Sequence, residues 1–404
     1  MVKKVFSNRN ILVISLTTTL WGVSNSGFQT FWSLWLRKDL GISLAMVGLL
    51  STFQSAEQLL FQLPGGIITD KIGRRKIILF GTFLRFFPPI IYLVATNWEH
   101  ILLATIINAS TSIYNPALEA IVADSLPSRQ RGTGYGAYRM ITSMPRVFMP
   151  TVGGIVMDAY GYSAGVKIFN VLTMVFVLIM LIVRMKLITE TLASSHSKRS
   201  TKTTFSDALH VPRSIWAMMA VATIGGFAIR MIQQLTPLFA REVLGLSNTE
   251  IGIASTALSL TSTLLIMPSG LISDRVGRKP LILIAEAITP LTTFAIPYVN
   301  GFLMYLGLQI ATGVGSALGG RHMGFSGGPA WQALISDYVP SERRGTVMGL
   351  QSTVSGVAGT PAALVGTYIY DNDPGSTFIV SAIIAATVIP IFLFGVKEPK
   401  KREE

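Results

Sequence analysis

The 404-residue chain contains no cysteine. A disulfide framework, a cysteine-ligated metal site and a thiol nucleophile are therefore excluded. Charged residues make up only 13% of the chain, whereas 50% is hydrophobic and the mean hydropathy is +0.53. Soluble domains carry about 25% charged residues, so this chain has too few to coat a soluble globule. The composition places it in a lipid bilayer.

The sequence also lacks a phosphate-binding loop and a histidine cluster. No Gly-x4-Gly-Lys-Ser/Thr segment is present, which argues against direct coupling to ATP. His196 and His210 lie in or beside a polar stretch without the clustered partners of a metal site. Gly324-Phe-Ser326-Gly-Gly fits a serine nucleophile motif, but no histidine follows His322 and that motif needs a strand, a turn and a helix. We expect no enzyme, no metal and no cofactor.

Long apolar runs are what the sequence has in abundance. A membrane-spanning helix needs about 20 mostly apolar residues. We expect six such spans in the first half, at 11–36, 44–68, 77–96, 99–124, 134–158 and 165–187, and six in the second, at 214–240, 246–272, 281–299, 301–337, 346–370 and 375–396. The first run is too long for a signal-peptide core and no small-residue cleavage site follows it. The predicted class is an all-α membrane protein with 12 transmembrane helices.

A polar segment divides the chain. Residues 188–213 are rich in serine and threonine and lack apolar periodicity until their end, which is typical of a flexible linker. We therefore expect a first domain at 1–187, a linker at 188–213 and a second domain at 214–404.

The net charge of +13 is distributed unevenly. The outer connections and the span ends beside them hold only Arg37, Lys38, Lys167 and Arg241, and five further basic residues lie deeper within the expected spans. The other 24 of the 33 lysines and arginines fall in the termini, the inner connections and the span ends beside them. Because basic residues concentrate on the cytoplasmic side of membrane proteins, we expect both termini in the cytoplasm. The charge is thus explained by topology, and we expect no nucleic-acid partner.

A charged segment between the second and third spans occurs twice. Gly66-Ile-Ile-Thr-Asp70-Lys71-Ile-Gly73-Arg74-Arg75-Lys76 lies 204 positions before Gly270-Leu-Ile-Ser-Asp274-Arg275-Val-Gly277-Arg278-Lys279-Pro280. The match continues upstream, where Arg37 to Ser43 meets Arg241 to Ser247. The chain is therefore a tandem duplication.

A second motif repeats at an offset of 213. It runs from Pro116 through Asp124 and Pro127 to Arg131, and again from Pro329 through Asp337 and Pro340 to Arg344. The larger offset puts extra residues inside the tenth span, in the glycine-rich stretch 313–329 that contains Arg321 and His322. Broken backbone at membrane depth is tolerated only where it faces protein or a wet cavity. The tenth span is therefore a candidate site element.

These motifs resemble those of the major facilitator superfamily over essentially the whole chain. The first loop copy matches the family signature at every position, at Gly66, Asp70, Lys71, Gly73, Arg74 and Arg75, while the second departs at Pro280. The resemblance implies two pseudo-symmetric six-helix bundles that rock about a central site to give alternating access.

The resemblance also implies that Asp70, Arg74 and Asp124 form a charge cluster that locks an inner gate. The alternative is that these charges only fix topology and anchor the loop. Arg139 and Glu119, near the same boundary, either join the network or extend to the membrane surface. The full candidate gate comprises Gly66, Asp70, Lys71, Gly73, Arg74, Arg75, Asp124, Arg131, Arg139, Asp274, Gly277, Arg278, Asp337 and Arg344.

Charges within the spans are costly unless they are paired or hydrated. Glu57 lies about 20 Å from the cytoplasmic end of its span at the helical rise, and Arg146 lies halfway along the fifth span. An opposite-charge pair there would couple transport to protons if Glu57 lost its partner in one conformation and took up a proton. The alternative is a permanent structural salt bridge.

Polar residues on the first and seventh spans suit an aqueous cavity. They are Asn25, Gln29, Arg230, Gln233 and Gln234, to which Arg321 and His322 of the tenth span are added. Hydrogen bonding between helices explains them equally well. Arg85 and Glu286 fall in the third and ninth spans, which by resemblance lie outside the cavity, so we expect them to be structural.

The direction of transport has only weak signals. Five arginines against three glutamates within the spans favour a substrate with a carboxylate or phosphate. Pro150-x-x-Gly153-Gly154 resembles part of an antiporter motif, although Pro145 and Met149 stand where that motif has glycines. We predict a monomeric cell-membrane transporter that exports a small organic solute in exchange for protons. The alternatives are an uptake symporter for an organic anion and a non-transporting receptor or scaffold.

Overall fold

The computed structural model describes residues 6–126, 131–191, 212–319, 329–339 and 341–397. All the regular structure in these ranges is helical. The chain divides into two compact units. Unit 1 comprises Met1–Lys198 with Ser247–Gly252, and unit 2 comprises Arg199–Leu246 with Ile253–Glu404.

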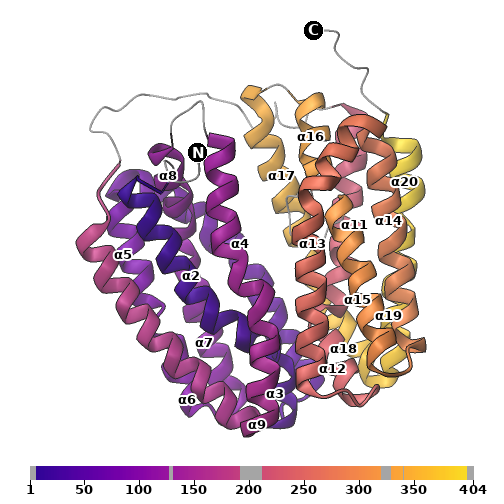
Figure 1. Ribbon diagram of the computed structural model, residues 1–404, viewed down its shortest axis with the longest axis horizontal. Helices are drawn as coiled ribbons and strands as arrows, with labels where there is room; N and C mark the ends of the chain where they lie inside the picture. The colour runs from indigo at the N-terminus through magenta and orange to yellow at the C-terminus, as the bar shows by residue number, and fades with distance from the viewer. Residues whose placement is uncertain (1–5, 127–130, 192–211, 320–328, 340, 398–404) are drawn as a thin grey trace. The chain divides into compact units, whose positions relative to one another are not determined.

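Unit 1 is built from the helices drawn in indigo to magenta in Figure 1. They are α2 (Arg9–Gln29), α3 (Trp32–Lys38), α4 (Leu44–Ile72), α5 (Arg74–Leu84), α6 (Phe87–Val94), α7 (Trp98–Thr111), η1 (Ser112–Tyr114), α8 (Asn115–Ser125) and α9 (Arg131–Leu187). Within α9 the backbone breaks at Gly161, where φ is 77° and ψ is 170°. This break separates two of the predicted spans, and the second of them continues to Leu187.

Unit 2 repeats this plan. Its helices are α11 (Arg213–Gln233), α12 (Leu235–Glu242), α13 (Asn248–Val276), α14 (Arg278–Ala295), η3 (Ile296–Tyr298), α15 (Gly301–Leu318), α16 (Pro329–Tyr338), α17 (Ser341–Gly359), α18 (Ala362–Asn372), α19 (Pro374–Ala386) and α20 (Val388–Gly395). The first turn of α13 belongs to unit 1 and the rest of that helix to unit 2.

Helices occupy the described parts of the predicted spans, but many of the spans are interrupted. Proline explains several interruptions, because it has no N–H to continue a helix and is tolerated in a first turn. Pro88 stands in the first turn of α6, Pro116 in that of α8, and Pro361 immediately precedes α18. Within the described ranges, nine helical stretches are long and apolar enough to cross a membrane, and one of them, Ala137–Leu187, holds two predicted spans.

The duplication is visible in the backbone. Gly41 and Gly245, 204 positions apart, have φ angles of 63° and 69°, and Gly73 and Gly277 have 104° and 103°. The same turns therefore follow the same helices in both halves.

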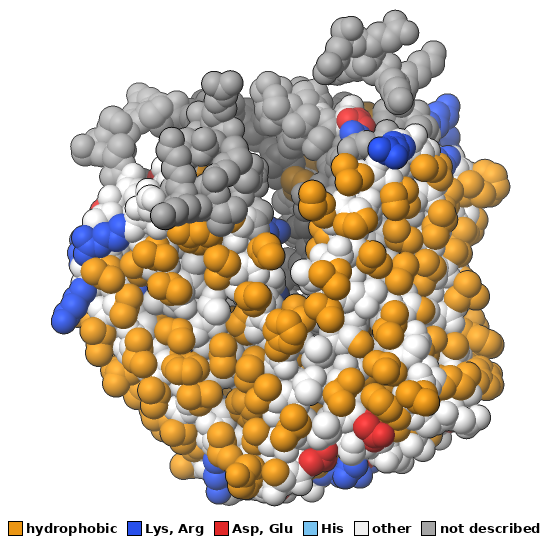
Figure 2. Space-filling view, in the orientation of Figure 1, with side chains coloured by type: hydrophobic (Ala, Val, Ile, Leu, Met, Phe, Trp, Pro, Cys, Tyr) orange, Lys and Arg blue, Asp and Glu red, His pale blue; other side chains and the backbone are white. Residues whose placement is uncertain are grey.

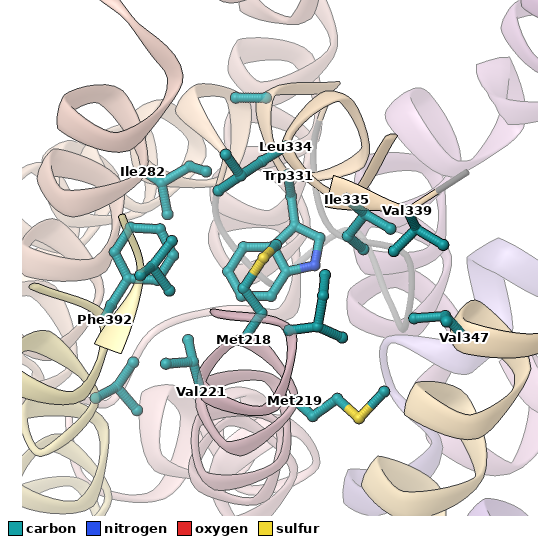
Figure 3. Packing of buried hydrophobic residues seen from close by; sticks show 14 of the residues in the cluster. Met218, Met219, Val221, Ile282, Trp331, Leu334, Ile335, Val339, Val347 and Phe392 are labelled. Carbon is teal, nitrogen blue, oxygen red and sulfur yellow. The ribbon is translucent and has the colours of Figure 1, made fainter. Parts of the chain in front are cut away.

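Each unit has its own hydrophobic core. In unit 2 the rings of Trp331 and Phe392 stack with centroids 5.9 Å apart, and Met218 and Ile282 pack around them (Figure 3). The unit 1 core includes Ile14 and Ile78, which match Met218 and Ile282, together with Ile11, Tyr114, Ile121 and Tyr138. Matched positions thus fill matched cores.

The surface is the reverse of a soluble protein's. Large hydrophobic side chains cover the flanks of the helices, and charged side chains gather at the helix ends (Figure 2). Leu303 and Phe394 are each 80% exposed. Such surfaces are unfavourable in water and favourable against lipid tails.

Candidate functional site

The end of unit 1 where α5 begins holds a cluster of charged residues. Arg74, the first residue of α5, forms an ion pair with Asp124 in the last turn of α8. Its guanidinium also donates hydrogen bonds to the Ala120 carbonyl at 3.3 Å and the Thr191 hydroxyl at 3.1 Å. The pair therefore joins the two motifs that the sequence repeats separately.

Glu190 completes this cluster. Its carboxylate accepts hydrogen bonds from the backbone N–H groups of Arg74 at 3.3 Å and Arg75 at 3.0 Å. A carboxylate at a helix N-terminus satisfies N–H groups that have no partner within the helix and meets the positive end of the dipole. We call Arg74, Arg75, Asp124, Glu190 and Thr191 the loop cluster.

Glu190 falls within the predicted linker at 188–213 and is not among the residues predicted for the gate. Its partners lie 116 and 115 positions away, so no local pattern marks it. In the folded protein the end of α9 lies beside the start of α5. The Arg75 guanidinium donates to the Met185 carbonyl at 2.7 Å and joins the two helices.

Unit 2 contains the matching ion pair. Arg278, the first residue of α14, pairs with Asp337 near the end of α16. Lys279 donates to the Leu393 carbonyl at 2.7 Å and so ties the start of α14 to α20. Arginine and aspartate therefore meet at equivalent places in both halves.

Several predicted residues lie outside what the structure describes. The helices that carry them are described, but the side chains are not, at Glu57, Gly66, Asp70, Arg131, Asp274 and Arg344. Arg321 and His322 lie between the described ranges altogether. The predictions for these eight positions stay predictions. Among the described candidates, Lys71, Arg139 and Arg146 are exposed.

The predicted cavity residues of the first and seventh spans are partly accessible. Asn25 and Gln234 are half-buried, and Gln29 and Gln233 are exposed. Arg230 donates to the Ser355 carbonyl at 2.8 Å and so links α11 to α17.

The Arg230 guanidinium packs against Gly359. A Cβ at Gly359 would overlap the guanidinium, so a larger residue there would displace the end of the arginine side chain. The hydroxyl oxygen of the same Ser355 lies 3.2 Å from that of Thr223. Ser355 of α17 therefore contacts two polar residues of α11.

Arg184, one of the 24 basic residues counted on the inner side, lies close to the end of α9, and its side chain is buried and only 1% exposed. It donates to the hydroxyl oxygens of Thr17 at 3.1 Å and Thr82 at 2.8 Å, and it lies 5.7 Å from the ring centre of Tyr114. The side chain lies between α2, α5 and α9. Two hydroxyls and an aromatic ring there take the place of the water that would solvate the guanidinium.

Arg85 also contacts the ring of Tyr114. Its guanidinium lies 4.3 Å from the ring centre of Trp21 and 4.9 Å from that of Tyr114, and it donates to Thr111 at 3.3 Å. Guanidinium groups within about 6 Å of aromatic ring centres make favourable cation–π contacts.

Unit 1 also has a cleft of about 460 Å³ at the far end of α6. Trp35, Tyr92, Asp39, Thr96 and Lys167 contribute to its lining. The rings of Trp35 and Tyr92 are 5.9 Å apart and edge-on. Tryptophan and tyrosine of this kind belong to the membrane–water boundary. The cleft contains none of the predicted cavity residues.

Comparison with known families and chains agrees with this architecture. The model of the Major Facilitator Superfamily matches residues 14–249 and 241–404. An MFS-type transporter of Methanocaldococcus jannaschii is 20% identical over 396 residues, which is 96% of this chain and 95% of that one. Quinolone resistance protein NorA of Staphylococcus aureus is 27% identical over 122 residues, 30% of this chain and only 31% of NorA.

Solved structures show the same fold at low identity. The nucleoside transporter NupG has a TM-score of 0.76 at 14% identity and covers 96% of this chain and 100% of its own. The D-xylose-proton symporter has a TM-score of 0.76 at 14% identity and covers 96% and 99%. The fold is thus the 12-helix arrangement of two pseudo-symmetric six-helix bundles. The chain belongs to the Major Facilitator Superfamily of transporters and is a multi-pass membrane protein.

Proposed function

We propose that this protein exports a small organic solute in exchange for protons, by alternating access between two six-helix domains at 1–187 and 214–404. Both termini face the cytoplasm, residues 188–213 form the linker, and the monomer is the working unit. The observation that carries the proposal is the pair of matched ion pairs, Arg74 with Asp124 and Arg278 with Asp337.

These pairs support a gate at the cytoplasmic ends. Each ion pair joins two helix ends of one unit, so it stabilises one arrangement of those ends at the start of α5 or of α14. The remaining gate residues are those of the two loop copies and the two Asp-to-Arg motifs, with Asp70, Asp274, Arg131 and Arg344 as further charges. Topology alone would require basic residues and no aspartate among them.

Glu57 and Arg146 carry the proposed proton coupling. A glutamate at mid-depth that loses its cationic partner becomes easier to protonate, because burial disfavours its charge. The solute passage is lined by Asn25, Gln29, Arg230, Gln233 and Gln234 with Arg321 and His322. Two signals support export: the partial antiporter motif at Pro150-x-x-Gly153-Gly154 and the partial resemblance to a quinolone resistance protein.

Uptake of an organic anion together with protons is the second candidate. The excess of arginine over glutamate within the spans favours it. A receptor or scaffold that kept the fold would carry no solute at all.

Proteoliposomes under an imposed proton gradient separate these functions. The purified protein is reconstituted, and a fluorescent quinolone and an organic anion are followed in turn. An antiporter concentrates its solute in the acidic compartment, because solute and protons move in opposite directions. A symporter concentrates its solute in the alkaline compartment. A protonophore must abolish either result, and protein-free liposomes correct for passive partitioning.

Replacement of Glu57 by glutamine tests the proton site. We expect Glu57→Gln to abolish concentrative flux and to leave solute counterflow at equal pH intact, because only proton binding is lost. The matched control is Glu99→Gln, an exposed acid in the first turn of α7. Unchanged concentrative flux in Glu57→Gln would remove Glu57 from the mechanism.

A further inference from the structure

The start of α13 is a helix N-terminus with two sets of partners. Within its own chain segment, the Ser247 hydroxyl accepts from the Glu250 N–H at 3.2 Å, and the Glu250 carboxylate accepts from the Ser247 N–H at 2.8 Å. This is a capping box, in which two N–H groups are satisfied reciprocally. The N–H groups of Asn248 and Thr249 are left for another partner.

Asp158 of α9 is that partner. One carboxylate oxygen accepts from the Asn248 N–H at 3.0 Å and from its side-chain amide at 2.8 Å. The other accepts from the Thr249 N–H and the Thr249 hydroxyl, both at 2.7 Å. Four donors therefore converge on one carboxylate, and hydrogen bonds to charged groups are about twice as strong as neutral ones.

The position of Asp158 in its own helix also favours its contact with the start of α13. It lies three residues before the break at Gly161, in the last turn of the first half of α9. An acid there meets the negative end of its own helix dipole, which is unfavourable, whereas the N-terminus of α13 is favourable. Just beyond the break, Tyr162 donates to the Asn248 side chain at 2.6 Å.

Two glycines allow α9 and α13 to approach closely at this joint. A Cβ at Gly154 would collide with the backbone of Asn248, and a Cβ at Gly252 with the backbone of Pro150. The joint is therefore both hydrogen-bonded and closely packed, and all of its residues belong to unit 1.

After Gly252 the same helix continues in unit 2. Movement of one unit against the other must then either bend α13 after this residue or release its first turn from α9. We infer that Asp158 is a latch: it holds the first turn of α13 on α9 in one state of the transport cycle and releases it in another. The inference rests on the proposed alternating access, and Asp158 acts as a positioning residue.

The repeat supplies a matched control. Asp158 lies 213 positions before Asp371, and Gly153 lies 213 before Gly366. A Cβ at Gly153 would meet the Gly27 carbonyl and one at Gly366 the Met231 carbonyl, so the two helices pack alike within their units. Asp371, however, is exposed, and its side chain makes no hydrogen bond or ion pair with the part of the chain that the structure describes.

Hydrogen exchange of the segment 247–252 in nanodiscs tests the latch without any solute. In the wild type this segment should exchange faster than the interior of α13, because it opens. Asp158→Ala should speed its exchange by about tenfold or more, the change that corresponds to about 1.4 kcal/mol. Thr249→Val, which removes one donor, should act in the same direction with a smaller effect, and Asp371→Ala should match the wild type.

Three results would overturn the latch. The first is equal exchange of this segment in Asp158→Ala and Asp371→Ala. The second is faster exchange along all of α13 in Asp158→Ala, which would indicate general destabilisation. The third is wild-type protection of 247–252 as strong as that of the helix interior. Protonophore-sensitive flux combined with any of these results would refute the latch and leave the transport function standing. The expected hydrogen-exchange rates without protonophore-sensitive flux would support the latch and refute the proposed transport function.

Discussion

Position 73 shows how one backbone angle limits what a residue can be. Gly73 has φ 104° and ψ 145°, and Gly277 has 103° and 158°. This region is accessible almost only to glycine. At Gly73 a Cβ would also lie 2.9 Å from the Glu190 carboxylate. The turn from α4 into α5 therefore requires glycine at position 73 for two reasons, the positive φ angle and the close approach of Glu190.

Replacing these glycines by alanine should destabilise the protein. We expect Gly73→Ala and Gly277→Ala each to cost about 1–3 kcal/mol through backbone strain, and to lower the unfolding temperature in detergent. Gly226→Ala is the control, because it lies inside α11 with open space around it and should be neutral or slightly stabilising. Equal unfolding temperatures in all three variants would refute the strain argument.

The buried Arg184 leads to an unusual ranking of substitutions. Thr17 and Thr82 already donate to the carbonyls of Val13 and Ile78, at 2.7 and 2.6 Å, so loss of Arg184 leaves no donor unsatisfied. Replacing a buried ion by an apolar side chain of similar volume is often neutral. A lysine would instead bury a strongly hydrated ammonium.

We therefore expect Arg184→Met to change stability by less than Arg184→Lys. Thermal unfolding of the two purified variants in one detergent measures the difference. A methionine variant that unfolds at a lower temperature than the lysine variant would show that the charge itself holds α2, α5 and α9 together.

Arg74 and Asp124 could be selected from sequence because each stands in a repeated motif. Glu190 and Arg184 could not, since their partners are more than 100 residues away and no local pattern marks either. Asp158 carried one usable signal: the second copy has Asp371 at the offset of 213. That signal identifies a repeated acid but not its partner, because within the described residues Asp158 caps a helix and Asp371 does not.

Among the elements, α19 begins with a cap that depends on pH. Asp373 accepts hydrogen bonds from the Ser376 hydroxyl and from the N–H groups of Gly375 and Ser376, each of the latter at 3.1 Å. These hydrogen bonds, that of the Ser376 side chain foremost, lower the pKa of the Asp373 carboxyl below its ordinary 3.8.

The sign of the pH effect follows from this lowered pKa. The folded state holds the carboxylate more strongly than the unfolded state, so the cap stabilises fully above the unfolded value of 3.8. The contribution disappears as the pH falls through the lower folded value. We expect wild type to unfold at a higher temperature than Asp373→Asn at pH 7 and the difference to shrink as the pH falls below 3.8. A difference that does not change with pH would assign the effect to something other than ionisation.

The existence of the spans was predictable because apolar length alone determines whether a helix crosses lipid. Their internal breaks were less so. Proline marks the starts of α6 and α8, and Pro237 stands in the first turn of α12, but the interruption between α2 and α3 at Phe31 has no proline. Hydropathy does not distinguish a straight helix from a broken one of the same length.

At the scale of the whole molecule, duplication is the dominant fact. Positive φ angles, core positions and the arginines of the ion pairs recur at an offset of 204, and the aspartates of the ion pairs recur at 213. The sequence therefore predicted the two-bundle fold. It did not predict the solute, because the residues that would line a passage differ between the halves, as Ser26 and Arg230 do.

The central claim of alternating access is that the two halves open at one end as they close at the other. Spin-label distances test it directly, because a chain with no cysteine accepts labels only where cysteines are introduced. One pair is Ile72→Cys with Val276→Cys, at the ends of α4 and α13. The other is Val94→Cys with Tyr298→Cys, at the opposite ends of the next spans. All four positions are exposed, and each pair is related by the repeat.

Both distances are measured in nanodiscs between pH 5.5 and 8. The account predicts reciprocal changes: conditions that lengthen the distance of one pair shorten that of the other. Two distances that stay fixed, or that lengthen and shorten together, would contradict it.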